Sequence, residues 1–137
     1  MSNTDYDNWI EKRIDELIHE NVQIEGLYDE EIIRDYLIFS QYGKSGEKLI
    51  KFFTDNRNNE ALLKVLFQIL LDESEDYSND SRYVAAKIIP LFETDILRNY
   101  KKELVYAQNY NIVNLRPFKG DYPNWLKETL PSVPPIN

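Results

Sequence analysis

An unusually apolar segment lies near the middle of the chain, from Ala61 to Leu71. Nine of its eleven residues are apolar, and the two exceptions, Lys64 and Gln68, stand four positions apart and in line with Glu60. In an α-helix this spacing places the polar side chains on one narrow stripe and leaves the rest of the circumference apolar. Eleven residues are too few to span a hydrocarbon layer of ~30 Å. The segment therefore predicts a buried central helix, for which Asn59 is a suitable N-cap.

A second apolar segment, from Arg82 to Ile89, follows ten largely acidic residues. Helical spacing places its apolar residues on one face, and Asp80 or Ser81 can cap its start. Pro90 cannot continue this helix, because it lacks a backbone donor and clashes with the preceding turn. The two apolar segments therefore predict a helical hairpin joined by the acidic loop Asp72–Ser81.

Helical periodicity continues on both sides of this hairpin. Apolar residues recur at intervals of three and four in further segments that begin near an Asp, Ser or Thr residue suited to capping. The predicted helices run from about Asp5 to Val22, from Asp29 to Tyr42, from Ser45 to Thr54 and from Thr94 to Asn109. The first helix is expected to bury one stripe that contains Trp9, Ile10, Ile14, Leu17 and Ile18. On the second helix Arg34 is expected to be exposed, and Gly43 suits the left-handed residue after a helix end.

The C-terminal segment, residues 111–137, has a different character. Residues 111–115 suggest a short extended piece, and Pro123 suits the first turn of a short helix near 123–130. Prolines nearer the end forbid further regular structure. We expect this segment to lie as a strap across the helices, anchored by Phe118, Trp125 and Leu126. The sequence as a whole predicts an all-α fold, a single domain over residues 1–137 with a bundle or short stack of about six helices.

Composition limits the class of protein. The chain of 137 residues is long enough for one domain with its own core, and it contains no cysteine. A disulfide framework and a thiolate site are therefore excluded, and the composition suits a reducing compartment. The N-terminus lacks the basic segment and apolar stretch of a signal peptide, and no apolar run reaches 18 residues. We expect a cytoplasmic protein without a membrane segment.

The negative charge is concentrated in two places. Residues 1–42 contain eleven acids and three bases, a net charge of −8, whereas the remaining residues contain thirteen of each. Within that neutral remainder the loop at 72–81 contains five acids and no base. Such a charge distribution repels phosphate backbones and anionic lipid, and it attracts basic partners at rates that fall with salt. Binding to nucleic acid or to a membrane is therefore not expected, and a basic protein partner is.

The sequence offers little for catalysis. His19 is the only histidine, which excludes a histidine-based metal site and a Ser–His or Cys–His dyad. Gly43-Lys44-Ser45 lacks the upstream glycine of a phosphate-binding loop. The acids from Asp72 to Asp76 resemble calcium ligands in spacing, but the glycine and glutamate of an EF-hand are missing at the sixth and twelfth positions. We therefore predict no enzyme activity, no metal and no cofactor, with a carboxylate-dependent hydrolase as a remote alternative.

Ten tyrosines are present, several of them beside acids, such as Tyr77 after Asp76. Tyrosine supplies rigid, amphipathic contact area and is enriched at binding hot spots. An AT-rich codon usage that raises Tyr, Asn, Ile and Lys together is the competing explanation, with the rings packed in the core. The tyrosines therefore suit a binding protein without requiring one.

Two resemblances follow from these residues. The helix at 60–71, the loop, and the Asp80-Ser81-Arg82-Tyr83-Val84-Ala85-Ala86 start of the next helix are similar to a HEAT-type unit, whose second helix often opens with Asp and Arg before an alanine-rich face. This resemblance covers about 34 residues and implies a helical stack. In size, acidity, helix content and lack of cysteine, the chain resembles the small immunity proteins of bacterial toxin systems. That resemblance is one of profile and carries over no functional residue.

We therefore hypothesise a cytoplasmic immunity protein that covers the basic substrate groove of a toxin domain, such as a nuclease of contact-dependent growth inhibition. The alternative is a HEAT-like adaptor that holds two proteins together without inhibiting either. The residues expected to bind the partner are Asp72, Glu73, Glu75, Asp76, Tyr77 and Asp80. A second acidic patch is expected at Asp29, Glu30 and Glu31.

Overall fold

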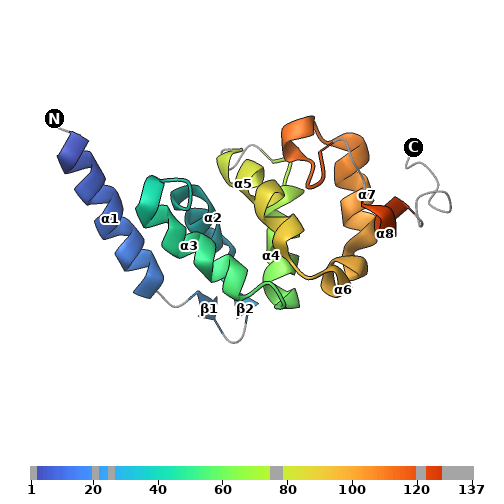
Figure 1. Ribbon diagram of the computed structural model, residues 1–137, viewed down its shortest axis with the longest axis horizontal. Coiled ribbons are helices and arrows are strands. Elements are labelled where there is room, and N and C mark those ends of the chain that lie inside the picture. The colour runs from blue at the N-terminus through green and yellow to red at the C-terminus, as the bar shows by residue number, and fades with distance from the viewer. Residues whose placement is uncertain (1–2, 20–21, 25–26, 75–78, 120–122, 128–137) are drawn as a thin grey trace.

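The computed structural model describes residues 3–19, 22–24, 27–74, 79–119 and 123–127 (Figure 1). Within these ranges the regular secondary structure is helical, apart from one hairpin of two short strands. This confirms the predicted all-α fold. The helices are spread along the long axis of the molecule, with α1 at one end and α7 and α8 toward the other (Figure 1). They are α1 (Asn3–His19), α2 (Glu30–Phe39), α3 (Gly43–Asp55), α4 (Glu60–Leu70), α5 (Asp80–Ile88), α6 (Thr94–Leu97), α7 (Lys101–Tyr110) and α8 (Asn124–Lys127), with 3-10 turns η1 (Ile89–Leu91), η2 (Arg98–Tyr100) and η3 (Val113–Leu115).

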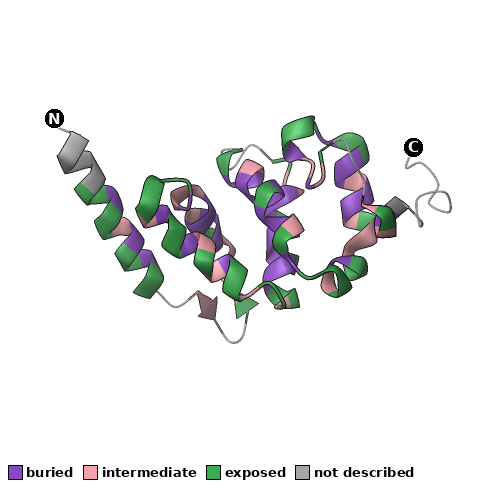
Figure 2. Ribbon diagram, viewed as in Figure 1, coloured by how far each residue is buried: buried purple, intermediate pink, exposed green. Residues whose placement is uncertain are grey.

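Helix α4 is the central helix that the apolar run predicts. Asn59 caps it, with its side chain accepting a hydrogen bond from the Leu62 amide at 3.2 Å. Lys64 and Gln68 lie exposed on the polar stripe, and seven of the eleven residues are buried (Figure 2). Each large apolar side chain buried in this way contributes ~1.5–3 kcal/mol. One apolar core runs from Ile10 on α1 to Leu126 on α8, with α4 at its centre.

Helix α1 buries a narrower stripe than expected. Ile10, Ile14 and Leu17 are buried, but Trp9 is 56% exposed and Ile18 is 39% exposed. The prediction that both would be buried is wrong, because α1 lies at one end of the molecule and packs mainly against α2 and α3 (Figure 1). A helix covered from one side buries the central row of its apolar face and leaves the edges of that face in solvent.

The connection between α1 and α2 contains the hairpin that the sequence analysis did not predict. Strands β1 (Gln23–Ile24) and β2 (Leu27–Tyr28) pair antiparallel, with Gln23 opposite Tyr28 and Ile24 opposite Leu27. The hairpin is fixed to the start of α4 because the side-chain amide of Asn59 donates to the Tyr28 hydroxyl at 2.6 Å. It thereby sets the position at which α2 begins.

The corner between α2 and α3 is tighter than predicted. α2 ends at Phe39 and α3 already begins at Gly43, two residues before the expected cap at Ser45. Gly43 has φ +55°, the left-handed conformation expected of it, although it opens α3 instead of closing α2. The two helices approach closely because Gly46 packs against the backbone of Ser40 and Phe39.

The C-terminal third departs from the prediction at two places. The helix expected over 94–109 is divided into α6, η2 and α7, with the Tyr100 ring stacked on Phe67 of α4 at 5.0 Å. Residues 113–115 form the 3-10 turn η3 and not an extended piece. Of the predicted strap anchors, Leu126 is buried and Phe118 packs edge-on against Trp125. The rest of the predicted strap, residues 128–137, lies outside the described residues.

Candidate partner-binding surface

The acidic loop is the connection between α4 and α5, and we name residues 72–80 the acidic connection. Of the residues predicted to bind a partner, Asp72, Glu73 and Asp80 are described. Glu75, Asp76 and Tyr77 lie outside the described residues. Asp80 is exposed in the first turn of α5, where a carboxylate is stabilised by the positive end of the helix dipole. Glu73 is exposed as well.

Asp72 is held by a buried arginine from another helix. Arg34 of α2 is only 3% exposed, and its Nη2 lies 2.8 Å from Asp72 Oδ2. Its Nε and Nη2 also donate to Glu30 Oε2 at 3.3 Å, and its Nη1 donates to the Ser81 hydroxyl at 3.2 Å. We name Arg34 with Glu30, Asp72 and Ser81 the arginine anchor. It joins α2 to both ends of the acidic connection, and it shows that the prediction of an exposed Arg34 is wrong.

A second buried guanidinium supports the acidic connection from the side of α5. Arg82 is 8% exposed, and its Nε donates to the Leu70 carbonyl at 2.8 Å. Because this carbonyl lies in the last turn of α4, no amide of the same helix can donate to it. Arg82 Nη1 also donates a hydrogen bond to Asn79 Oδ1 at 3.4 Å. Two buried cations therefore hold residues on either side of the acidic connection, Arg34 through side chains and Arg82 through the Leu70 backbone carbonyl.

These contacts determine the protonation of Asp72. The hydroxyl and the backbone amide of Ser74 hydrogen-bond the carboxylate, and with the nearby Arg34 guanidinium they lower the pKa of Asp72 below its ordinary value. Asp72 is therefore charged at neutral pH, and its charge is matched by Arg34. Its role in the surface is to join the start of the acidic connection to α2.

Glu73 brings a tyrosine pair into the surface. The Tyr106 hydroxyl on α7 donates to Glu73 Oε1 at 3.1 Å, and this hydrogen bond and the carboxylate charge raise the pKa of Tyr106. The Tyr106 and Tyr110 rings lie 5.2 Å apart, and Tyr110 is exposed. The sequence analysis did not select these two tyrosines, since their spacing of four on a helix gives no sign that a glutamate 33 positions away lies beside them.

The second acidic patch proves to be continuous with the first. Asp29 caps α2, accepting hydrogen bonds from the Glu31 and Ile32 amides at 2.9 and 3.3 Å. Glu30 binds the same Arg34 nitrogen as Asp72, so the two patches meet at the arginine anchor. Glu31 is exposed. Among the described residues, the exposed carboxylates of the joined surface are therefore Glu31, Glu73 and Asp80, and Asp29, Glu30 and Asp72 support its structure.

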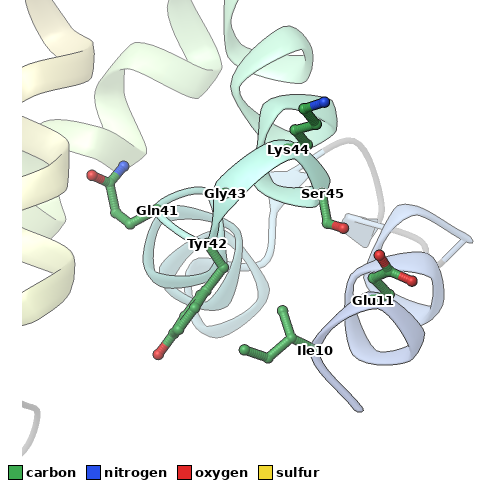
Figure 3. A pocket seen from close by; sticks show the side chains of 7 residues that line it. All are labelled: Ile10, Glu11, Gln41, Tyr42, Gly43, Lys44 and Ser45. Carbon is green, nitrogen blue, oxygen red and sulfur yellow. The ribbon is translucent and has the colours of Figure 1, made fainter. Parts of the chain in front are cut away.

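The Gly43-Lys44-Ser45 segment lines a different hollow. Together with Ile10 and Tyr42 it borders a cavity of about 390 Å³ at the corner of α2 and α3 (Figure 3). The Lys44 amine points away from Tyr42 and Ile10 in Figure 3, whereas a phosphate-binding loop directs its lysine toward the ligand. Over the described ranges, no group of three His, Asp or Glu side chains is arranged to hold a metal ion.

Comparison of the chain with protein-family models, with curated proteins and with solved structures found no match. In the part of the chain that the structure describes, no helix has the length and apolar character needed to cross a membrane.

Asp72 is expected to make an acid-sensitive contribution to stability. Because its pKa is lower in the folded protein, this contribution is complete above the ordinary Asp pKa of about 3.9 and is lost as the pH falls through the folded value. Asp72→Asn should therefore lower the free energy of unfolding by a constant amount from neutral pH to about pH 5, and the deficit should shrink below about pH 4. Urea titrations of both proteins across this range measure the difference. A deficit that persists unchanged in strong acid would contradict the assigned role.

Proposed function

We propose that this protein binds and neutralises a basic protein partner, most specifically as an immunity protein that blocks a toxin nuclease. The observation that supports it is the joined acidic surface, in which the buried Arg34 and Arg82 hold residues on either side of the acidic connection while Glu31, Glu73 and Asp80 are exposed. A nuclease must present cations to bind a phosphate backbone. An acidic surface of fixed shape is complementary to such a groove.

The mechanism we propose separates capture from retention. Exposed carboxylates accelerate encounter with a basic groove, and this acceleration falls as salt screens the charges. The Tyr106–Tyr110 pair beside Glu73 offers aromatic contact area of the kind that dominates binding energy. Because the arginine anchor already holds Asp72 and Ser81 in place, binding sacrifices less conformational entropy at these residues than it would without the anchor.

Charge reversal at this surface tests the proposed binding. The triple variant Glu31→Lys, Glu73→Lys and Asp80→Lys should weaken binding to the cognate toxin domain by about 100-fold or more at physiological salt, mainly through slower association. Binding kinetics at several salt concentrations measure this, using the toxin domain encoded beside the gene. Growth of cells that express both proteins provides the functional readout, since the wild type should restore growth and the triple variant should not.

A matched control uses a carboxylate outside the surface. Asp95 is exposed on α6, at the other end of the α4–α5 hairpin from the acidic connection (Figure 1). Asp95→Lys changes the net charge in the same direction as each single reversal but should alter affinity by less than about threefold. Equal losses for Asp95→Lys and the single reversals would show that net charge alone acts, and unchanged affinity in the triple variant would remove the surface from the proposal.

One observation favours the second candidate, an adaptor with two binding surfaces. Trp9 is exposed and lies 6.1 Å from the Phe39 ring, which lies 5.6 Å from Tyr42. This aromatic cluster is at the C-terminal end of α2, about 14 Å from the N-terminal end that carries Glu30, given a rise of 1.5 Å per residue. Trp9→Ala distinguishes the two functions, because an adaptor should lose one of two partners while an inhibitor should keep its full activity.

A further inference from the structure

A basic pocket lies between α5 and the loop that follows α7, away from the acidic connection. Its volume is about 470 Å³, within the range of small-molecule sites. Tyr83, Ala86 and Lys87 of α5 form one wall, and Arg116, Pro117 and Lys119 form the other. η3, which begins this loop, packs against α5 (Figure 1). The pocket therefore combines three cations with an aromatic and apolar wall.

The charge of this pocket is unusual for such an acidic protein. No carboxylate is among its lining residues, and within the described chain none of Lys87, Arg116 and Lys119 forms an ion pair. The one carboxylate on the same helix is Asp80, which lies two helical turns from Lys87, about 10 Å along the axis, and borders a neighbouring hollow that Tyr83 and Lys87 also line. Three cations that line one pocket without a counter-ion among the described residues favour an anion as their partner.

The loop that supplies two of these cations is rigidly built. The buried Gln108 amide donates to the Lys119 carbonyl at 2.9 Å and accepts from the Phe118 amide at 2.9 Å. The side-chain amide of the buried Asn111 donates to the Leu115 carbonyl at 3.1 Å. The backbone carbonyl of Asn111 accepts from Arg116 Nε at 2.7 Å. Arg116 therefore uses Nε to hold the loop, and the same side chain lines the pocket. Pre-ordered side chains of this kind are what a binding site requires.

The backbone at Lys119 is in a conformation that lysine rarely adopts. Its φ is +53°, the only positive φ at a non-glycine residue in the described chain. Glycine or asparagine accommodates this conformation at less cost, so the loop retains a lysine where a neutral residue would fold more easily. Strained positions of this type concentrate at ligand-binding sites, where the side chain has a use.

We propose that this pocket binds a small organic phosphate that carries a flat ring, the chemistry of a nucleoside diphosphate. The phosphates are bound by Lys87, Lys119 and the Nη groups of Arg116, whose planar fork matches phosphate oxygens. The ring lies against Tyr83 and Pro117, since a base stacks on an aromatic face without needing specific hydrogen bonds. This site is independent of the acidic surface and of its proposed function.

The test uses the full chain and a fluorescence signal near the pocket. Trp9 and Trp125 are the two tryptophans, and Trp125 lies edge-on to Phe118 of the pocket loop at 6.2 Å. In a Trp9→Phe background, ADP should produce a saturable change in Trp125 emission, and calorimetry should give the same affinity. Pyrophosphate should bind about tenfold more weakly than ADP, because it lacks the ring, and adenosine should show no saturation at millimolar concentration.

The variants separate charge from fold. Lys119→Gly removes the charge where the backbone favours glycine, so it should weaken ADP binding about tenfold without lowering the melting temperature. Lys119→Arg should keep the affinity within about threefold, Lys87→Gln should weaken binding about tenfold, and Lys44→Gln, at a residue that does not line the pocket, should leave it unchanged. Tyr83→Leu should abolish the preference for ADP over pyrophosphate. Absence of saturable ADP binding, or binding that ignores Lys87 and Lys119, would overturn the proposal.

Discussion

Replacing Arg34 with methionine is expected to lower the free energy of unfolding by about 3 kcal/mol. Methionine keeps much of the packing volume but leaves the partly buried Glu30 and Asp72 carboxylates and the buried Ser81 hydroxyl without their guanidinium donor. Removing one member of a buried ion pair typically costs ~3–5 kcal/mol, and the lower figure applies because Glu30 and Asp72 retain 36% and 26% of their side-chain exposure. Urea-induced unfolding followed by circular dichroism measures the loss.

Two variants show whether position and geometry matter more than charge. Arg13→Met removes the same charge from a more exposed pair with Glu16 and Asp35, so it should cost less than about 1 kcal/mol. Arg34→Lys retains the charge but lacks the planar fork that reaches three partners, so an intermediate cost of about 1–2 kcal/mol is expected. If Arg34→Met and Arg13→Met have equal effects, Arg34 does not anchor the acidic connection.

Coupling within the anchor provides a further check. Arg34→Met combined with Asp72→Asn and Glu30→Gln removes the uncompensated charges along with the cation, and it should recover at least about half of the lost stability. Simple addition of the separate losses would mean that the three groups act independently. Recovery would show that the partly buried carboxylates destabilise the folded protein when Arg34 is missing. It would also show that Arg34 joins α2 to the α4–α5 hairpin by pairing with them.

The anchor also marks the limit of what the sequence could predict. The central helix α4, its Asn59 cap and the end of α5 at Pro90 follow from patterns within about ten residues, and all three predictions are confirmed. Arg34 stands on α2 among Glu30, Glu31 and Asp35, which local periodicity assigns to an exposed face. Its burial depends on Asp72 and Ser81, 38 and 47 positions away, and no local pattern contains that information.

The acidic surface illustrates the same limit. Residue counts located the acids at 29–31 and 72–80, and the structure joins the two groups at a single arginine nitrogen. The counts do not distinguish the carboxylates that cap a helix or balance a buried cation from those that remain exposed. That distinction needs the tertiary contacts of Asp29, Glu30 and Asp72.

Local sequence patterns also do not show which part of a helix surface its neighbours cover. Trp9 and Ile18 lie on the predicted apolar face of α1, yet they are exposed because no further helix in the described chain packs on that side. The two-residue strands at 23–28 and the 3-10 turn at 113–115 are too short for any periodicity. The basic pocket, formed by residues 30 positions apart on α5 and the loop after α7, was likewise not predicted.

Gly46→Ala is expected to lower the free energy of unfolding by about 3 kcal/mol, although the same change stabilises an ordinary helix interior by up to about 1 kcal/mol. A Cβ atom at this position would lie 2.5 Å from the Ser40 carbonyl oxygen, 2.7 Å from the Ser40 carbonyl carbon and 2.9 Å from the Phe39 carbonyl oxygen. These are backbone atoms at the end of α2, so no side chain can turn aside to relieve the contact. α3 would have to move away from α2 as a unit, and the buried Leu49 and Phe53 would lose packing with it.

Gly43 supplies the matched control, since it lies three residues earlier in the same helix. Its φ is +55°, but a Cβ atom there would meet nothing within 4 Å. Gly43→Ala therefore costs only the strain of a left-handed alanine, about 1–2 kcal/mol. Thermal and urea unfolding of both variants compare the two effects, and Gly46→Ala should have the lower melting temperature. A Gly46→Ala protein as stable as the wild type would mean that α2 and α3 separate without loss, and the close corner would then not be what positions Tyr42 beside Phe39 and Trp9.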